Sequence, residues 1–221
     1  MLQRMIVPLI IGVAGVAVLV SLGNWQVQRL AWKEGVLADI EARIAAAPVP
    51  LPDRPDPDSH RYLPVTATGI IGAEAIRVLV STREDGAGYR IISTFETDGR
   101  IVLVDLGFID VEAEIPPGGP AVVIGNLHWP DEVTNSTPDP DLLRNIWFAR
   151  DVPVLADTLS AEPVLIIARS IEPGRNIRPL PVGTEGIPND HLQYAGTWFS
   201  LAFIWFGMTL YLLWRIRQRT V

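Results

Sequence analysis

The chain has 221 residues, of which 48% are hydrophobic and 19% charged, and its formal net charge is −7. It contains no cysteine, which excludes disulfides, thiolate metal sites and CxxC redox chemistry together. All 25 acidic residues lie between Glu34 and Asp190 with 12 of the 18 basic ones, so this segment carries −13, whereas each flank holds three bases and no acid. The pattern predicts an acidic soluble domain between two apolar ends, and such a domain is not expected to bind nucleic acid.

The first apolar end predicts a transmembrane helix within residues 1–28. No charge occurs from Met5 to Gln28, and the stretch to Leu22 is almost wholly aliphatic or small. At ~1.5 Å per residue that stretch spans about 27 Å, close to the thickness of a bilayer core. The alternative is a cleaved signal peptide with its cut between Ser21 and Gly23. We favour an uncleaved anchor, because there is no A-x-A site and the apolar face continues beyond that point.

Helical periodicity continues past the first apolar run to about Ala47. Prolines then end the helix, and residues 48–64, which contain six prolines, predict an extended linker or wrapping loop.

The central segment, assigned to a domain of residues 29–190, is rich in short strand-forming runs. Asp98-Gly99 between two of them predicts a tight hairpin. Asp151 is expected to cap a short helix, with Pro153 in its first turn and its end near Leu159. The class is therefore α+β, a mainly antiparallel β-barrel or sandwich with a peripheral helix. The predicted strands are residues 65–71, 76–82, 89–95, 101–109, 121–127 and 164–171.

The second apolar end predicts a transmembrane helix and a short tail within residues 191–221. Residues 192–214 carry no charge and would span about 34 Å as a helix. Arg4 before the first span and Arg215, Arg217 and Arg219 after the second predict that both termini lie on the cytoplasmic or matrix side, with the domain on the outer side. Arg29 and Lys33 run against this pattern.

Signatures of an enzyme are missing from the sequence: there is no G-x-S-x-G, phosphate loop or H-E-x-x-H. The three histidines stand far apart. His60 is expected to be solvent-exposed in its loop, and His128 to pack beside Trp129 at a strand end. A non-enzymatic protein is therefore predicted.

His191 starts the second apolar run, where a bilayer meets water. On a helix it shares one face with Tyr194, Trp198 and small residues that would leave room, an arrangement that suits axial coordination of a haem. The alternative is an interfacial aromatic belt. Gly196 and Ser200, spaced as a small-x-x-x-small pair, predict close packing against another helix.

The first apolar run ends in a comparable motif, with Trp25, Arg29 and Trp32 on one helical face. The Arg29 guanidinium has carboxylates, such as haem propionates, or lipid phosphates as expected partners. Snorkelling of Arg29 and Lys33 to headgroups beside anchoring tryptophans remains the alternative.

Three ordered blocks of sequence resemble the surfeit locus protein family, membrane-bound assembly factors of haem-copper cytochrome c oxidase. Residues 22–33 (LGNWQVQRLAWK) are similar to its G-x-W-Q-x-x-R-x-x-W-K signature. Residues 88–90 (GYR) and 101–109 (IVLVDLGFI) resemble a strand pair of the family, and residues 189–200 (NDHLQYAGTWFS) its N-[ND]-H-L-x-Y-A-x-T-W-[FY]-S motif. Two residues depart from the family pattern. Leu106 stands where an Arg or Asn is common, which is expected to bear on a surface contact of the domain. Gly196 stands where an aliphatic residue is usual, which is expected only to loosen local packing.

This resemblance implies a protein of a bacterial-type or mitochondrial inner membrane that delivers or stabilises haem a while oxidase subunit I matures. His191 would be the axial ligand of the haem iron, Tyr194 and Trp198 would line the site, and Trp25 and Arg29 would lie near its edge. Implied partners are oxidase subunit I, haem a synthase and membrane lipid. The alternative is a scaffold that holds unassembled oxidase subunits without haem.

Overall fold

The computed structural model describes residues 2–184 and 187–218, so Arg219 of the orientation argument lies outside the described residues. The described chain forms two compact units. One contains the long helices, up to Asp39 and from Thr184 onward, and the other is residues Ile40–Gly183.

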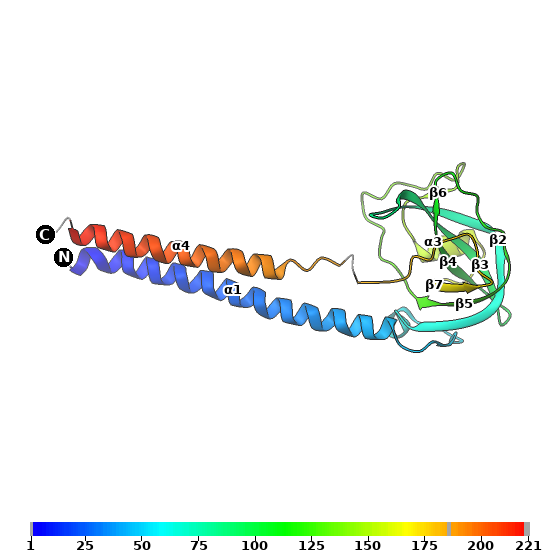
Figure 1. Ribbon diagram of the computed structural model, residues 1–221, viewed down its shortest axis with the longest axis horizontal. Helices are drawn as coiled ribbons and strands as arrows, with labels where there is room; N and C mark the ends of the chain where they lie inside the picture. Colours follow the sequence, from blue (N-terminus) through cyan, green and yellow to red (C-terminus); the bar gives the residue numbers. More distant parts are fainter. Residues whose placement is uncertain (1, 185–186, 219–221) are drawn as a thin grey trace. The chain divides into compact units, whose positions relative to one another are not determined.

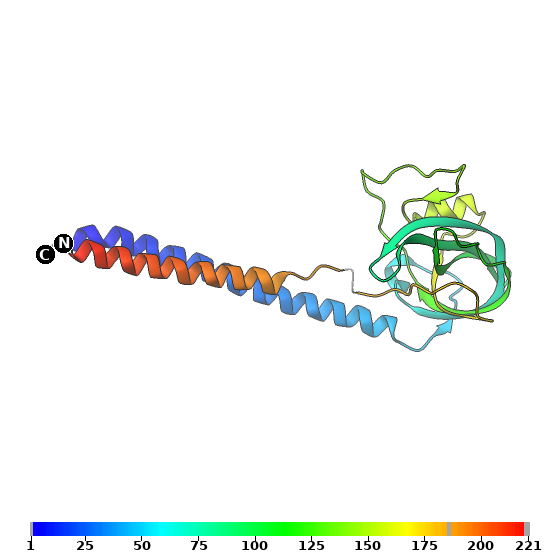
Figure 2. The same cartoon turned by 45° about the horizontal axis from the view of Figure 1, so that its top comes forward.

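The helical unit is built from α1 (Leu2–Ile44) and α4 (His191–Gln218). In both views the two helices lie side by side and antiparallel, with the beginning of α1 next to the end of α4 (Figure 1; Figure 2). The apolar run and the amphipathic stretch after it form one uninterrupted helix, which ends shortly before Pro48. Within the described residues, these two helices are long and apolar enough to cross a membrane.

Small residues bring the two helices into contact along a surface that we call the helix seam, defined by its buried residues Gly12, Gly23, Gln26, Ala195 and Ala202. A Cβ atom added to Gly23 would lie 2.7 Å from the Phe199 ring, and one added to Gly12 would collide with Thr209. Backbones that approach this closely require residues without bulky side chains.

Gly196 and Ser200 do not pack against α1, because both are exposed. In the described chain no atom lies within 4 Å of a Cβ placed on Gly196, so there is no packing at this glycine to loosen. Ala195 and Ala202, seven residues apart, form the close surface of α4 instead, since a seven-residue spacing returns to the same helical face.

The second unit contains a mixed sheet and two short helices. The strands confirm all six predicted runs, but the first two are joined in one long strand, β2, whose register shifts between Ile71 and Ala75. The elements in chain order are β1 (Val49–Pro50), α2 (Pro57–His60), β2 (Pro64–Thr82), β3 (Gly86–Thr97), β4 (Arg100–Asp110), β5 (Gly119–Leu127), β6 (Ile146–Trp147), α3 (Val152–Thr158) and β7 (Leu165–Glu172).

Five of these strands close into a barrel, which decides between the predicted barrel and sandwich. β2 pairs with β3, β3 with β4, β4 with β7, β7 with β5, and β5 returns to β2. All of these pairs are antiparallel except β4 with β7, and Figure 2 shows the strands curving into a ring. The order one, two, three, five, four along the chain is the connectivity of an OB-type barrel.

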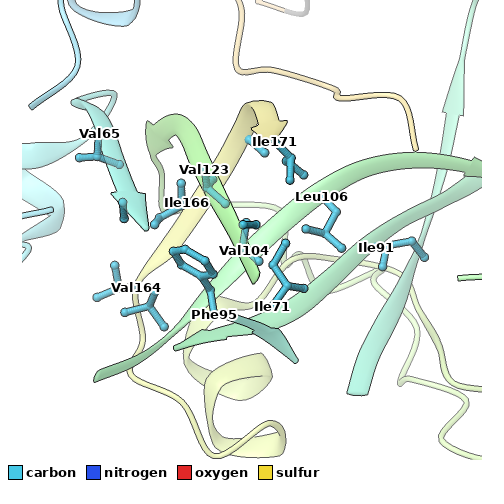
Figure 3. Packing of buried hydrophobic residues seen from close by; sticks show 14 of the residues in the cluster. Val65, Ile71, Ile91, Phe95, Val104, Leu106, Val123, Val164, Ile166 and Ile171 are labelled. Carbon is cyan, nitrogen blue, oxygen red and sulfur yellow. The ribbon is translucent and has the colours of Figure 1, made fainter. Parts of the chain in front are cut away.

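Alternating side chains divide the apolar residues of the barrel between two sides. One set, which includes Phe95, Val104, Leu106 and Ile166, fills the barrel interior (Figure 3). The opposite set packs the outer face of the strands against α3, and Leu155 of α3 is completely buried there. Leu106 is only 2% exposed, so the expected surface contact at this position is wrong. Successive side chains of β4 point to opposite faces, and the side chain of Leu106 points into the barrel interior.

Local signals of turns and caps are mostly confirmed. Asp98 and Gly99 both have positive φ in the turn between β3 and β4. The Asp151 side chain accepts from the Val154 N–H at the start of α3, and Leu159 caps its end. The proline-rich segment is more ordered than the predicted linker, because it contains α2 and adds β1 to the edge of β2.

Candidate cofactor site

His191 and Gln26 meet where the helix seam ends. The Nδ1 atom of His191, the first residue of α4, lies 2.8 Å from the Oε1 atom of Gln26 on α1. Gln26 follows Gly23 by three residues, which keeps it on the face of α1 that contacts α4, and its side chain is 8% exposed. The contact joins the first family-like block to the third.

The contact determines which nitrogen of His191 can act as a ligand. An amide oxygen can only accept a hydrogen bond, so with Oε1 facing the ring Nδ1 carries the proton. Nε2 then keeps its lone pair, which is the form of imidazole that binds a metal. Metal-ligating histidines commonly donate the other ring N–H to an oxygen in this way.

The other predicted site residues flank this pair without bonding to His191. Tyr194 and Trp25 are 56% and 54% exposed, and Trp198 is half-buried. The Arg29 guanidinium lies 3.8 Å from the centre of the Trp32 ring, a cation–π contact within α1. No hydrogen bond or ring contact between described residues joins His191 to any of the four.

The room predicted beside His191 is closed on one side. Ala195 and Ala202 are 3% and 6% exposed, because small residues let the helices approach instead of leaving a gap. Tyr194, at 56%, is among the exposed large side chains at this end of α4, together with Leu192 at 68%.

The residues present fit a haem better than a bare metal ion. No group of three His, Asp or Glu side chains in the described chain could hold an ion, whereas a haem brings its own equatorial ligands and needs an axial imidazole. Two residues before His191, Asn189 has a buried Oδ1 with no hydrogen-bond partner among the described residues.

A second polar cluster lies in the barrel unit and was not predicted. Asp105 is fully buried, and its Oδ2 lies 2.6 Å from Arg90 Nη1 and 3.4 Å from Arg150 Nη1. Arg150 also pairs with Glu132. Burial alone would raise the pKa of Glu132, but the hydrogen bonds and charge of Arg150 outweigh it and lower this pKa. A charged residue inside the apolar run of residues 101–109 was the signal for this cluster.

The other two histidines have structural surroundings. His128 directly follows the end of β5, as predicted, and its ring stacks on that of Tyr62 with ring centres 5.1 Å apart. Burial, followed by the charges of Arg150 and Arg61, lowers the pKa of His128 to about 4. His60 is half-buried, not exposed as predicted, and its Nδ1 accepts from the Asp56 N–H at 3.0 Å.

The chain combines a closed β-barrel with two long apolar helices, and His191 of one helix contacts Gln26 of the other. The chain belongs to the SURF1 family, whose model matches residues 13–203, and this confirms the resemblance seen in the sequence. It is 31% identical to a SURF1-like protein of Monosiga brevicollis, over 87% of this chain and 82% of that one. It is 30% identical to Surfeit locus protein 1 of Homo sapiens, over 84% of this chain and 72% of that one.

Proposed function

We propose that this chain is a non-enzymatic membrane protein that binds haem a through His191 and delivers or stabilises it while subunit I of a haem-copper cytochrome c oxidase matures. The observation that carries the proposal is the contact of His191 with Gln26, which leaves Nε2 as a free ligand atom at the end of an apolar helix pair. Membership of the SURF1 family supports it.

Membrane insertion of α1 and α4 is part of the proposal. Large apolar side chains point outward along both helices, for example Ile10 (61% exposed), Phe203 (78%) and Met208 (65%). Apolar surface of this extent requires a cover, which lipid tails provide. Arg215 and Arg217 in the last turn of α4 support an orientation with this end on the cytoplasmic or matrix side of an inner membrane, and the antiparallel pairing of the helices would put the start of α1 on the same side.

Each site residue has a defined task in this proposal. With a haem present, His191 would hold its iron, Tyr194 and Trp198 would pack against the ring, and Arg29, beside Trp25, would pair with a propionate. When bound, the haem supplies the redox-active iron that subunit I needs. A single protein ligand allows release, as is required of a protein that receives its cargo from haem a synthase and passes it to subunit I.

The proposal is tested in cells that lack their own copy of this protein and make haem a. The haem a content of purified oxidase is measured after complementation with wild type, His191→Ala or Gln193→Ala. Gln193 is exposed on the same turn of α4 and is the matched control. We expect a severalfold loss with His191→Ala alone, and full haem content in that variant would reject the carrier role.

A haem-independent scaffold is the second candidate, favoured by one observation. Leu142 and Leu143 are 71% and 100% exposed between β5 and β6, and exposed neighbouring leucines are typical of protein contacts. Crosslinking of subunit I that is equally strong in cells unable to make haem a, together with full complementation by His191→Ala, would support the scaffold.

A further inference from the structure

Gln26 is the buried polar side chain on the α1 side of the helix seam, where the other buried positions are glycines. A glutamine placed among apolar helices is costly unless its amide is hydrogen-bonded. Its Oε1 meets His191 Nδ1 at 2.8 Å. Gln28, two residues further, is exposed on the same helix and has no such contact with any described residue. Among the described residues, the ring of His191 is therefore the partner that offsets the cost of burying the Gln26 side chain.

We propose that Gln26 is a positioning residue, which holds His191 in the tautomer protonated at Nδ1 and fixes the ring so that Nε2 faces a ligand. This inference rests on the proposed haem-binding function for its purpose, but the tautomer itself does not require haem. An imidazole that can rotate divides its proton between both nitrogens, and only the form protonated at Nδ1 is a ligand through Nε2.

The geometry also explains why the glutamine comes from α1 and not from α4. His191 is the first residue of α4, so the preceding turn of helix that could hold its ring is missing. Gly12 and Gly23 bring α1 close enough for a side chain of glutamine length to reach the ring. Close packing of the helices and the state of the histidine are thus coupled.

The first test needs no cofactor. The full chain is labelled with ¹⁵N-histidine, purified without haem, and its ring nitrogens are observed by NMR at alkaline pH, with His191→Ala used to assign the signals. We expect His191 to be protonated at Nδ1 in wild type, in Gln28→Leu and in Gln26→Glu, whose carboxyl oxygen still accepts. Gln26→Leu should move the proton toward Nε2. Protonation at Nε2 in wild type, or no change in Gln26→Leu, would overturn the inference.

The second test measures haem affinity by titrating haem a into the same apo proteins. Loss of an oxygen that orients a ligating histidine typically weakens metal binding by about 10- to 100-fold, so we expect a loss in this range for Gln26→Leu, with affinity retained in Gln26→Glu and Gln28→Leu. If wild type binds no haem a, the proposed function fails while the NMR result still decides the tautomer. If wild type binds and Gln26→Leu binds equally well, only the inference fails.

Discussion

Single residues show where sequence reasoning worked and where it stopped. His191 was found because a lone histidine at the start of an apolar run is unusual, but its partner was missed. Gln26 looks like an ordinary polar residue near a membrane surface until α4 is placed beside it. Asp105 was missed for the same reason, because its two arginines come from β3 and from a segment 45 residues away along the chain.

Residue His128 makes the stability of the barrel unit depend on pH. Its folded pKa of about 4 lies below the ordinary 6.5, so the unfolded chain binds the proton more readily. As far as His128 is concerned, the free energy of unfolding has its full value above about pH 6.5. It decreases as the pH falls toward 4, by on the order of 3 kcal/mol in total. The measurement is denaturant unfolding of the full chain, followed by tryptophan fluorescence, at several values of pH in this window.

The matched variant for this measurement is His128→Phe, which keeps a ring to stack on Tyr62 and cannot be protonated. We expect most of the decline between pH 6.5 and pH 5 to disappear in this variant. A decline of the same size would show that another group causes it.

Elements were predictable wherever the local pattern alone decides them. The Asp98-Gly99 turn, the Asp151 cap and the strands of the barrel follow from short-range chemistry. The helical faces through which α1 and α4 contact each other cannot be predicted in this way. Gly196 and the glycines of α1 are equally small, so the sequence does not show which of them lie at the contact. Only the pairing shows that Gly12, Gly15 and Gly23 face α4 whereas Gly196 faces outward.

The close packing at the helix seam predicts that substitution of its glycines increases the distance between α1 and α4. Gly12→Leu should force the helices apart by roughly 2 Å, since helix separation follows the size of the side chains at the contact. Gly207→Leu, at a position with no atom within 4 Å among the described residues, is the control. The chain has no cysteine, so spin labels on Ser21→Cys and Leu201→Cys report the distance directly. Equal label distances in the two leucine variants would contradict the seam.

For the whole molecule, the uneven charge of the sequence corresponds to the two compact units. The acidic middle contains the closed barrel, and the apolar ends, which carry bases but no acid, pair as antiparallel helices. The closure of the barrel could not be predicted from the sequence, because β2 must pair with β5 and β4 with β7, and the paired strands lie far apart along the chain. The helix pair places Arg29 and Lys33 on the same helix as Gln26, close to the end of the seam where His191 lies. Arg29, one of the two bases that disagree with the orientation pattern, is a predicted site residue, and Lys33 follows it by four residues on α1.

Haem a binding by His191 is measured most directly by the absorption spectrum of the full chain, purified in detergent from cells that make haem a. Wild type and His60→Ala, a histidine outside the site, are expected to carry haem a, and His191→Ala is expected to have lost most of it. An equal haem a spectrum in His191→Ala would contradict the assignment of His191 as the ligand.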